Sequence, residues 1–139
     1  MKNDVVAHFL DGRLVKGTSL DVAPNRPRCH VRTDDTMVEV ELAKLKALFF
    51  VRDIDGDREY TDSITADPSD MRLRGAKGIE VRFHDGERFV GLTNRYPPNQ
   101  QFFFVLPIDA NSNNIRVLVN RFAVESIKEH VPAGQGGGA

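Results

Sequence analysis

The acidic stretch Asp53–Glu59 places side-chain oxygens at the first, third, fifth and seventh positions of a run, a spacing that could coordinate calcium. A calcium loop also needs a glycine at its sixth position and a glutamate at its twelfth, where this chain has Arg58 and Ile64. The similar run Asp109–Asn114 fails in the same way, with Asn120 at the twelfth position. We interpret the first as a solvated acidic turn and the second as a hairpin turn, and predict no metal site.

Two arginines, Arg28 and Arg32, are separated by three residues. This spacing resembles that of PilZ domains, which bind cyclic dinucleotides, and their partner motif Asp-x-Ser-x-x-Gly is approached by Asp67–Arg72. Arg72 stands where that motif has a glycine, which lets a backbone approach its ligand closely. Strand alternation also puts both arginines and His30 on one outward face, as is ordinary for a solvated surface. A cyclic-dinucleotide-binding signalling domain is therefore kept only as a further alternative.

Groups for catalysis are not arranged in any motif that we can identify. The spacing of the four histidines is not that of metal ligands: His8, His30, His84 and His130. Cys29 corresponds to Phe103 in the repeat described below, which predicts a packing role. We predict a protein that is not an enzyme and needs no cofactor.

The elements that position these residues come from a segment that occurs twice. Val5–Gly17 reappears 74 residues later as Ile79–Gly91, and after a five-residue insertion Val38–Val40 aligns with Val117–Val119. The positions that recur unchanged are Phe9/Phe83, Asp11/Asp85, Gly12/Gly86, Gly17/Gly91, Pro24/Pro98, Asn25/Asn99 and Val31/Val105. One unit used twice therefore organises the chain.

Each copy predicts five short strands, because apolar and polar residues alternate and Asp-Gly turns join the first two strands. Five short curled strands fit a small barrel. The fold class that we predict is all-β, with two tandem five-stranded SH3/Sm-like small barrels related by an internal repeat. The predicted segments are a first barrel over 1–52, an acidic linker over 53–78, a second barrel over 79–131 and a flexible tail over 132–139.

The order of strands, turns and glycines resembles the Sm-like family, whose first motif is matched by Gly12, Gly17, Asp21 and Asn25. In that family the Asp and the Asn lie at an RNA-binding loop. The resemblance implies an alternative function in RNA binding, through Asn25, Arg26, Arg28 and Asn99. The chain also resembles an uncharacterised bacterial family of tandem repeats with appended regulatory domains, which implies an accessory role in signalling.

Composition bears on these alternatives. The formal net charge of −1 counts against RNA, because contacts to phosphate supply most of the affinity for nucleic acid. The single cysteine excludes an internal disulfide framework and suits a reducing compartment. We see no signal peptide and no membrane-spanning apolar run, so we expect a cytoplasmic protein with no membrane partner.

Some apolar residues occupy positions that are polar in the opposite copy. They are Val6, Leu10, Phe49, Val51, Phe102 and Phe104, opposite Glu80, His84, Lys128, His130, Arg28 and His30. Large exposed apolar patches are rare in monomers, so we predict that these six residues are buried in an interface. The function that we favour is a non-catalytic regulatory or protein-interaction module, whose partner is another protein or a second copy of itself.

Overall fold

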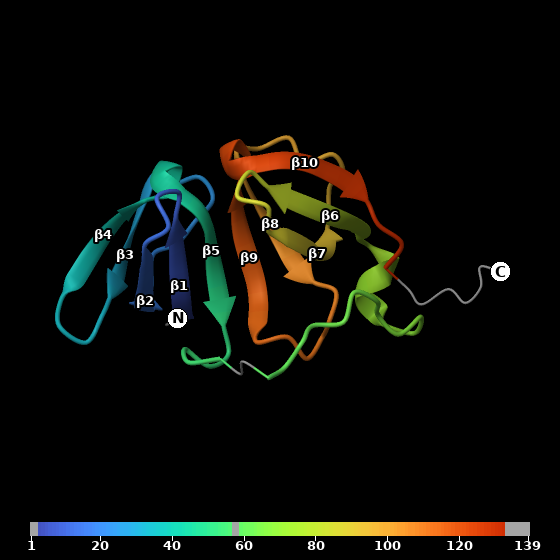
Figure 1. The fold of residues 1–139 in the computed structure, drawn as a ribbon, viewed down its shortest axis with the longest axis horizontal. Helices are drawn as coiled ribbons and strands as arrows, with labels where there is room; N and C mark the ends of the chain where they lie inside the picture. The colour runs from blue at the N-terminus through green and yellow to red at the C-terminus, as the bar shows by residue number, and fades with distance from the viewer. Residues whose placement is uncertain (1–2, 57–58, 133–139) are drawn as a thin grey trace.

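The computed structural model describes residues 3–56 and 59–132, which form an antiparallel β-structure with short 3-10 turns (Figure 1). The strands are β1 (Asn3–Phe9), β2 (Leu14–Ser19), β3 (Arg28–Arg32), β4 (Met37–Glu41), β5 (Leu45–Val51), β6 (Lys77–Phe83), β7 (Arg88–Thr93), β8 (Phe102–Pro107), β9 (Asn114–Asn120) and β10 (Val124–Glu129). The turns are η1 (Leu42–Lys44), η2 (Met71–Arg74) and η3 (Arg121–Ala123). The all-β prediction is confirmed. Residues 133–139 of the predicted flexible tail, and residues 57–58 of the acidic stretch, lie outside the described residues.

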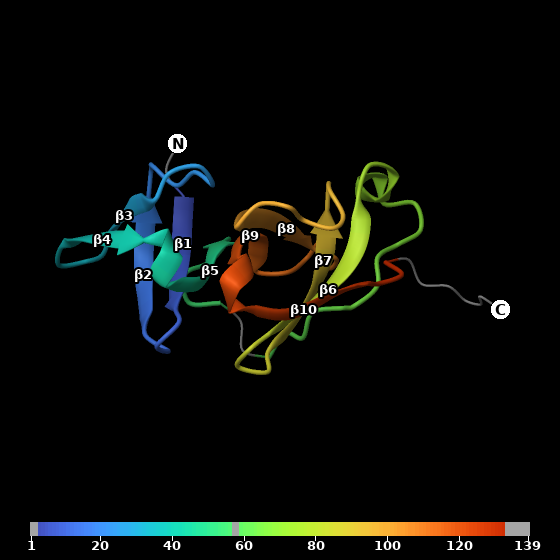
Figure 2. The same cartoon turned by 90° about the horizontal axis from the view of Figure 1, so that it is seen from above.

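All ten strands of the described chain belong to one open sheet, in the order β10-β6-β7-β8-β9-β5-β1-β2-β3-β4. Figure 2 shows β1–β4 on one side of the joint between β5 and β9, and β6–β8 on the other. We call β1–β5 the first half and β6–β10 the second half. The joint runs from the pair Ala47↔Val119 to the pair Val51↔Asn114. This pairing makes one continuous sheet, and the two separate barrels stay a prediction.

The hairpins that open each half form for the reasons that the sequence suggests. Buried and half-buried residues alternate along β1, whose inward side chains include Val5 and Phe9. The turns after β1 and β6 contain Gly12 and Gly86, with φ of 93° and 94°. These left-handed values favour glycine strongly, which is why Asp-Gly marks the turn.

Two hydrophobic clusters lie on the two sides of the joint, and each takes side chains from the opposite half. Leu118 of β9 belongs to the cluster of the first half, and Ala47 of β5 belongs to that of the second. Phe102 and Phe104 of β8 also pack against the first cluster, and Phe49 of β5 packs against the second. Burying one such side chain contributes about 1.5–3 kcal/mol, so these exchanged residues hold the halves together.

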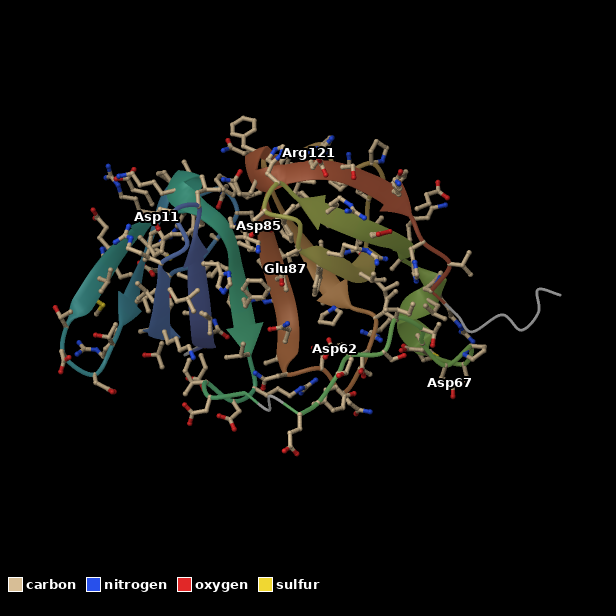
Figure 3. The ribbon with its side chains drawn as sticks, viewed as in Figure 1. Asp11, Asp62, Asp67, Asp85, Glu87 and Arg121 are labelled. Atoms are coloured by element: carbon tan, nitrogen blue, oxygen red, sulfur yellow. The ribbon has the colours of Figure 1, made fainter. Side chains whose placement is uncertain are left out.

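A buried lysine adds an electrostatic contact across the joint. The side chain of Lys46 on β5 is only 8% exposed, and its Nζ lies 2.7 Å from Oδ2 of Asp85 and also contacts Glu87. Both acids come from the turn between β6 and β7, in the middle of the molecule (Figure 3). Nζ also lies 4.7 Å from the centroid of the Phe83 ring. Burial alone would lower the pKa of Lys46, but its hydrogen bonds to Asp85 and Glu87 outweigh burial and raise it.

The segment that connects the halves folds onto the second half. The buried carboxylate of Asp109 accepts a hydrogen bond from the Tyr60 hydroxyl and another, of 2.8 Å, from the Ser63 backbone N–H. Arg72 donates to the carbonyl oxygens of Pro107 and Ile108, at 2.7 and 2.6 Å. This part of the predicted acidic linker is therefore fixed to the loop between β8 and β9.

The buried ion pair predicts an asymmetry between its partners. In the double variant Asp85→Asn plus Glu87→Gln, Lys46 keeps its charge and loses its counter-ions, which costs about 3–5 kcal/mol for a fully buried pair. The acid side chains are 54% and 48% exposed, so we expect a loss of about 3 kcal/mol. Lys46→Met leaves two hydrated acids and should lose less than half as much. Urea denaturation of both variants measures the difference, and equal losses would contradict this account of the joint.

Two glycines predict a second effect on stability. A Cβ at Gly17 or Gly91 would overlap the carbonyl oxygen of Arg32 or Leu106 on the neighbouring strand. Gly17→Ala and Gly91→Ala should therefore each lower the free energy of unfolding by about 1–3 kcal/mol. Gly75→Ala is the control, because a Cβ there would meet nothing within 4 Å, and it should change the free energy by less than about 1 kcal/mol. Thermal or urea unfolding tests the series, and a tolerated Gly91→Ala would contradict the observed approach of β7 to β8.

Candidate functional site: a groove between two loops

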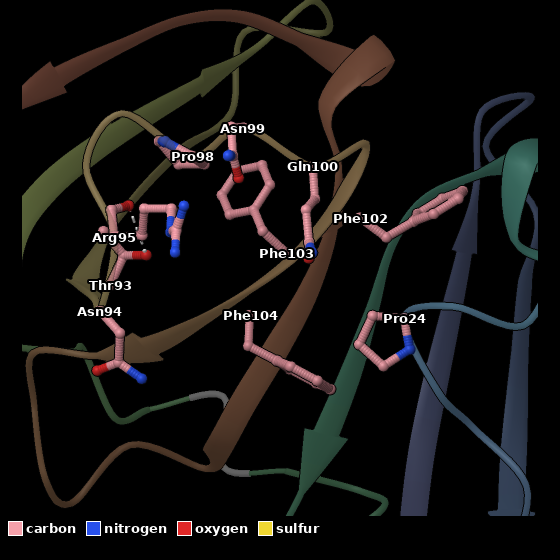
Figure 4. Close-up of a pocket in the computed structure, with 10 residues that line it drawn as sticks. All are labelled: Pro24, Thr93, Asn94, Arg95, Pro98, Asn99, Gln100, Phe102, Phe103 and Phe104. Atoms are coloured by element: carbon pink, nitrogen blue, oxygen red, sulfur yellow. Dashed lines mark hydrogen bonds between the residues drawn. The ribbon is translucent and has the colours of Figure 1, made fainter.

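Two adjoining pockets lie where the loop after β2 meets the loop between β7 and β8. Their volumes are about 370 and 780 Å³, and they share Pro24, Gln100 and Phe102 in their walls. Pro24 belongs to the first half and the other two residues to the second, so the site exists only because the halves are joined. Figure 4 shows Pro24 on the side of β8 that also carries Phe102 and Phe104. We call the two pockets together the loop groove.

The walls of the loop groove combine amides, arginines and apolar rings. They consist of Pro24, Asn25, Arg26, Pro27, Thr93, Asn94, Arg95, Pro98, Asn99, Gln100, Gln101, Phe102, Phe103 and Phe104. None of these described wall residues is acidic. Side-chain amides both donate and accept hydrogen bonds, so they can pair with an extended backbone or with the edges of bases. The two arginines favour an anionic group on the ligand.

Hydrogen bonds from η3 hold the loop between β7 and β8 in place. The Arg121 side chain donates to the carbonyl oxygen of Pro98 at 2.7 Å, and its backbone N–H donates to that of Gln101 at the same distance. The Thr93 hydroxyl donates to the carbonyl oxygen of Arg95 at 3.3 Å, the dashed line in Figure 4. The loop is therefore fixed at both ends, while the amides and guanidinium groups on its surface are exposed.

The structure brings three of the four predicted RNA-binding residues to the loop groove. Asn25 and Arg26 line one pocket and Asn99 lines the other. Arg28 lies outside it on β3, where its Nε is 3.9 Å from Oε1 of Glu39. The groove therefore contains one of the two arginines that we predicted to contact RNA.

Asp21, which the Sm-like resemblance placed at the same loop, makes contacts within the first half. Its Oδ1 accepts hydrogen bonds from the His30 backbone N–H at 2.8 Å and from the Ser19 hydroxyl at 3.2 Å. Its Oδ2 lies 2.7 Å from Nδ1 of His30. Burial raises the pKa of Asp21, but these hydrogen bonds outweigh burial and lower it. Asp21 thus fixes the base of the loop and does not line the groove.

The six predicted interface residues lie at or beside the joint. Val6, Phe49 and Val51 line a shallow groove together with Glu87 and Asn113 of the second half. Phe102 and Phe104 pack against the first-half cluster. Leu10 is 57% exposed and lines a pocket with residues of the second half, including Phe83, His84 and Phe122.

Sequence reasoning missed two cations at the joint. The guanidinium carbon of Arg116 lies 4.3 Å from the centroid of the Phe50 ring and 4.6 Å from that of Phe104, which are 6.0 Å apart. Such cation–π contacts contribute about 0.5–2 kcal/mol each. Lys46 carried a visible signal, since it interrupts the otherwise apolar strand Leu45–Val51. Arg116 carried none, because its partners come from both halves.

The two parts of the candidate cyclic-dinucleotide motif are not brought together. Arg28 and Arg32 lie on β3 at one end of the molecule, and Asp67 lies at the other end (Figures 1 and 3). Asp67 accepts hydrogen bonds from the backbone N–H and hydroxyl of Ser69, and Arg72 is occupied by Asp70 and the β8–β9 loop. The Arg28 and Arg32 guanidinium groups therefore have no partner motif beside them in this fold.

Groups suited to metal binding or nucleophilic catalysis are also dispersed. No cluster of three or more histidine, cysteine or acidic side chains that could hold a metal ion occurs in residues 3–56 and 59–132. Cys29 is buried, and burial raises the pKa of its thiol to about 11. A thiol with that pKa is protonated at neutral pH and is a poor nucleophile.

In the described part of the chain, no helix is long and apolar enough to cross a membrane. Comparison with curated proteins and with solved structures gives no match. One family model does match, over residues 1–130, and its description is "Family of unknown function (DUF6982)". Because that match covers almost the whole sequence, the chain belongs to the DUF6982 family.

Proposed function

We propose that this chain is a non-catalytic regulatory module that binds an extended segment of another protein in the loop groove. The observation that carries the proposal is the composition of the groove, in which exposed amides and two arginines surround half-buried aromatic rings. Both halves contribute to its walls, so ligand binding and the joint are coupled by geometry.

The proposal includes two copies of one five-stranded SH3/Sm-like unit. The strand order supports this interpretation, because β5-β1-β2-β3-β4 and β10-β6-β7-β8-β9 follow the same relative sequence. The two halves also use equivalent Asp-Gly turns and equivalent close-packed glycines. In this view the groove forms between the matching loops of the two copies.

The chemistry of the groove specifies the kind of peptide. An extended segment presents backbone N–H and C=O groups, which Asn94, Asn99 and Gln100 can pair with. Apolar side chains of the ligand would pack on Phe102 and Phe104, and a carboxylate would pair with Arg26 or Arg95. The ligand that fits best is therefore an extended peptide with both acidic and apolar residues.

Selection from a library of random linear peptides tests this proposal. We expect the selected peptides to be enriched in acidic and apolar residues. The double variant Arg26→Glu plus Arg95→Glu should weaken their binding by at least roughly tenfold, which corresponds to about 1.4 kcal/mol. Arg74→Glu reverses a single charge on η2, outside the groove, and should leave the affinity unchanged. Selection of basic peptides, or equal losses in both variants, would reject the proposal.

RNA binding is the second candidate, since aromatic rings beside arginines can stack bases and contact phosphates. Fluorescence anisotropy with a single-stranded uridine oligonucleotide, at low and high salt, separates the two candidates. If the groove binds peptide, the oligonucleotide should bind the native chain no more tightly than the Arg26→Glu plus Arg95→Glu variant. Tight binding that weakens steeply with salt and is lost in that variant would favour RNA instead.

A further inference from the structure

The joint between β5 and β9 has a counterpart at the two ends of the sheet. With the 79-residue offset of the repeat, β10 corresponds in sequence to β5, and β4 corresponds to β9. Within the described chain β10 is hydrogen-bonded only to β6, and β4 only to β3. We infer that the chain associates with a second copy of itself, head to tail, by pairing β10 of one molecule with β4 of the next. This inference rests on the two-copy architecture proposed above.

The free edges can continue the backbone ladder. An edge strand presents unpaired N–H and C=O groups that can accept another strand. The register of the joint, with Ala47↔Val119 and Leu48↔Leu118, transfers to Ser126 opposite Val40 and to Ile127 opposite Glu39. A second molecule would therefore meet a strand of the same direction as the one already paired inside the chain. β10 and β4 have six and five residues, where β5 and β9 have seven each.

The charged residues of the joint have counterparts of opposite charge at the two free edges. Inside the chain, Lys46 on β5 contacts Asp85 and Glu87 on the turn between β6 and β7. The counterpart of Lys46 is Glu125, and the counterpart of Glu87 is Arg13. The strand has exchanged a cation for an anion, and the turn has exchanged an anion for a cation. Glu125 of one molecule is thus matched to Arg13 of the next, and both side chains are exposed.

Asp11, the counterpart of Asp85, does not cancel this match. Its carboxylate already accepts hydrogen bonds from the backbone N–H and from Nε of Arg13, at 3.0 and 2.9 Å. The guanidinium group of Arg13 keeps further N–H donors for a second carboxylate. The turn can therefore hold Glu125 while the Asp11 contact persists.

A second contact of the joint, at the other end of the strand, is also replaced by different residues at the free edges. In the joint, Phe50 of β5 packs against Phe104 and under Arg116. At the free edges the counterparts are Glu129, His30 and Met37, so an aromatic contact is replaced by an acid facing an imidazole. A groove of about 390 Å³ beside His30 could receive the Glu129 side chain of a second molecule. It is lined by Thr18, Leu20, Asp21, His30, Arg32 and Met37.

The charges around that groove favour an incoming acid only in part. Arg28 and Arg32 lie on the same strand face as His30, and Lys77 lies 3.9 Å from Glu129 in its own molecule. Asp21 and Glu39 are the acids that face the imidazole, at 2.7 and 3.7 Å. The pair Glu125 and Arg13 is therefore the sharper test.

The same charges restrict which edges can pair. Two β4 strands placed side by side would bring Glu39 and Glu41 of both molecules together, which is unfavourable. Pairing of β10 with β4 avoids that repulsion, so the edges select each other. A head-to-tail contact of this kind repeats until it closes into a ring, or continues as a filament.

Reversal of the charges at the proposed contact tests the inference. The mass of the native chain, measured by light scattering and sedimentation over a range of concentrations, should exceed that of one 15.6 kDa chain. Glu125→Arg alone and Arg13→Glu alone should each weaken association by at least roughly tenfold. The double variant should recover it, because the charges are then exchanged and matched again.

An equimolar mixture of the two single variants provides a matched control. Each variant repels its own kind, but Arg at position 125 of one meets Glu at position 13 of the other, and the native pair forms at the next contact. The mixture should therefore associate like the native chain, while each component alone associates at least roughly tenfold more weakly. Circular dichroism and urea unfolding of each variant show whether it is folded.

A native chain that is monomeric at all concentrations, or a mixture that behaves like its components, would overturn the inference. Selected peptides should bind the folded edge variants with native affinity, because the loop groove does not include residues 13 and 125. Failure of self-association would then leave the proposed peptide-binding function standing.

Discussion

The pairing of β5 with β9 is the contact on which the rest of the structure depends. It makes one sheet from two sets of strands, and it lets Ala47 and Leu118 complete clusters that belong mainly to the opposite half. It also places the loop after β2 beside the loop after β7, so the loop groove is a product of the joint. A chain with the same strands but a different joint would have neither complete cores nor this groove.

The buried lysine makes that joint specific. Apolar contacts tolerate small shifts between strands, whereas a buried ammonium group is stable only where its counter-ions lie within hydrogen-bond distance. Lys46 meets Asp85 and Glu87 in one register of β5 against β9. Hydrophobic burial therefore supplies most of the attraction between the halves, and the ion pair restricts where they meet.

The sequence was sufficient for the elements but not for their assembly. Alternation and Asp-Gly turns predicted an all-β chain of ten short strands, because a strand with one buried face records that face in every second residue. The same pattern marked Phe49 and Phe104 as residues outside their own core. The pattern could not identify β9 as the partner of β5. Alternation shows which face of a strand is buried, whereas the joint forms along the hydrogen-bonding edge of the strand. The loop groove was predicted only in part, through Asn25, Arg26 and Asn99, because Pro24 and Gln100 meet there only after the joint has formed.

The distance along the chain between β5 and β9 has a consequence for protein synthesis. β5 ends at Val51 and its partner begins at Asn114, so the ribosome must add the whole stretch between them before the joint can close. During that interval the nascent chain exposes the edge of β5, an apolar strand that carries Phe49. An exposed apolar edge of this kind can pair with other chains. The residues made next, 53–76, include seven acidic and three basic side chains. Like charges carried directly behind an apolar strand repel a second nascent chain, so this stretch protects the edge until its own partner emerges.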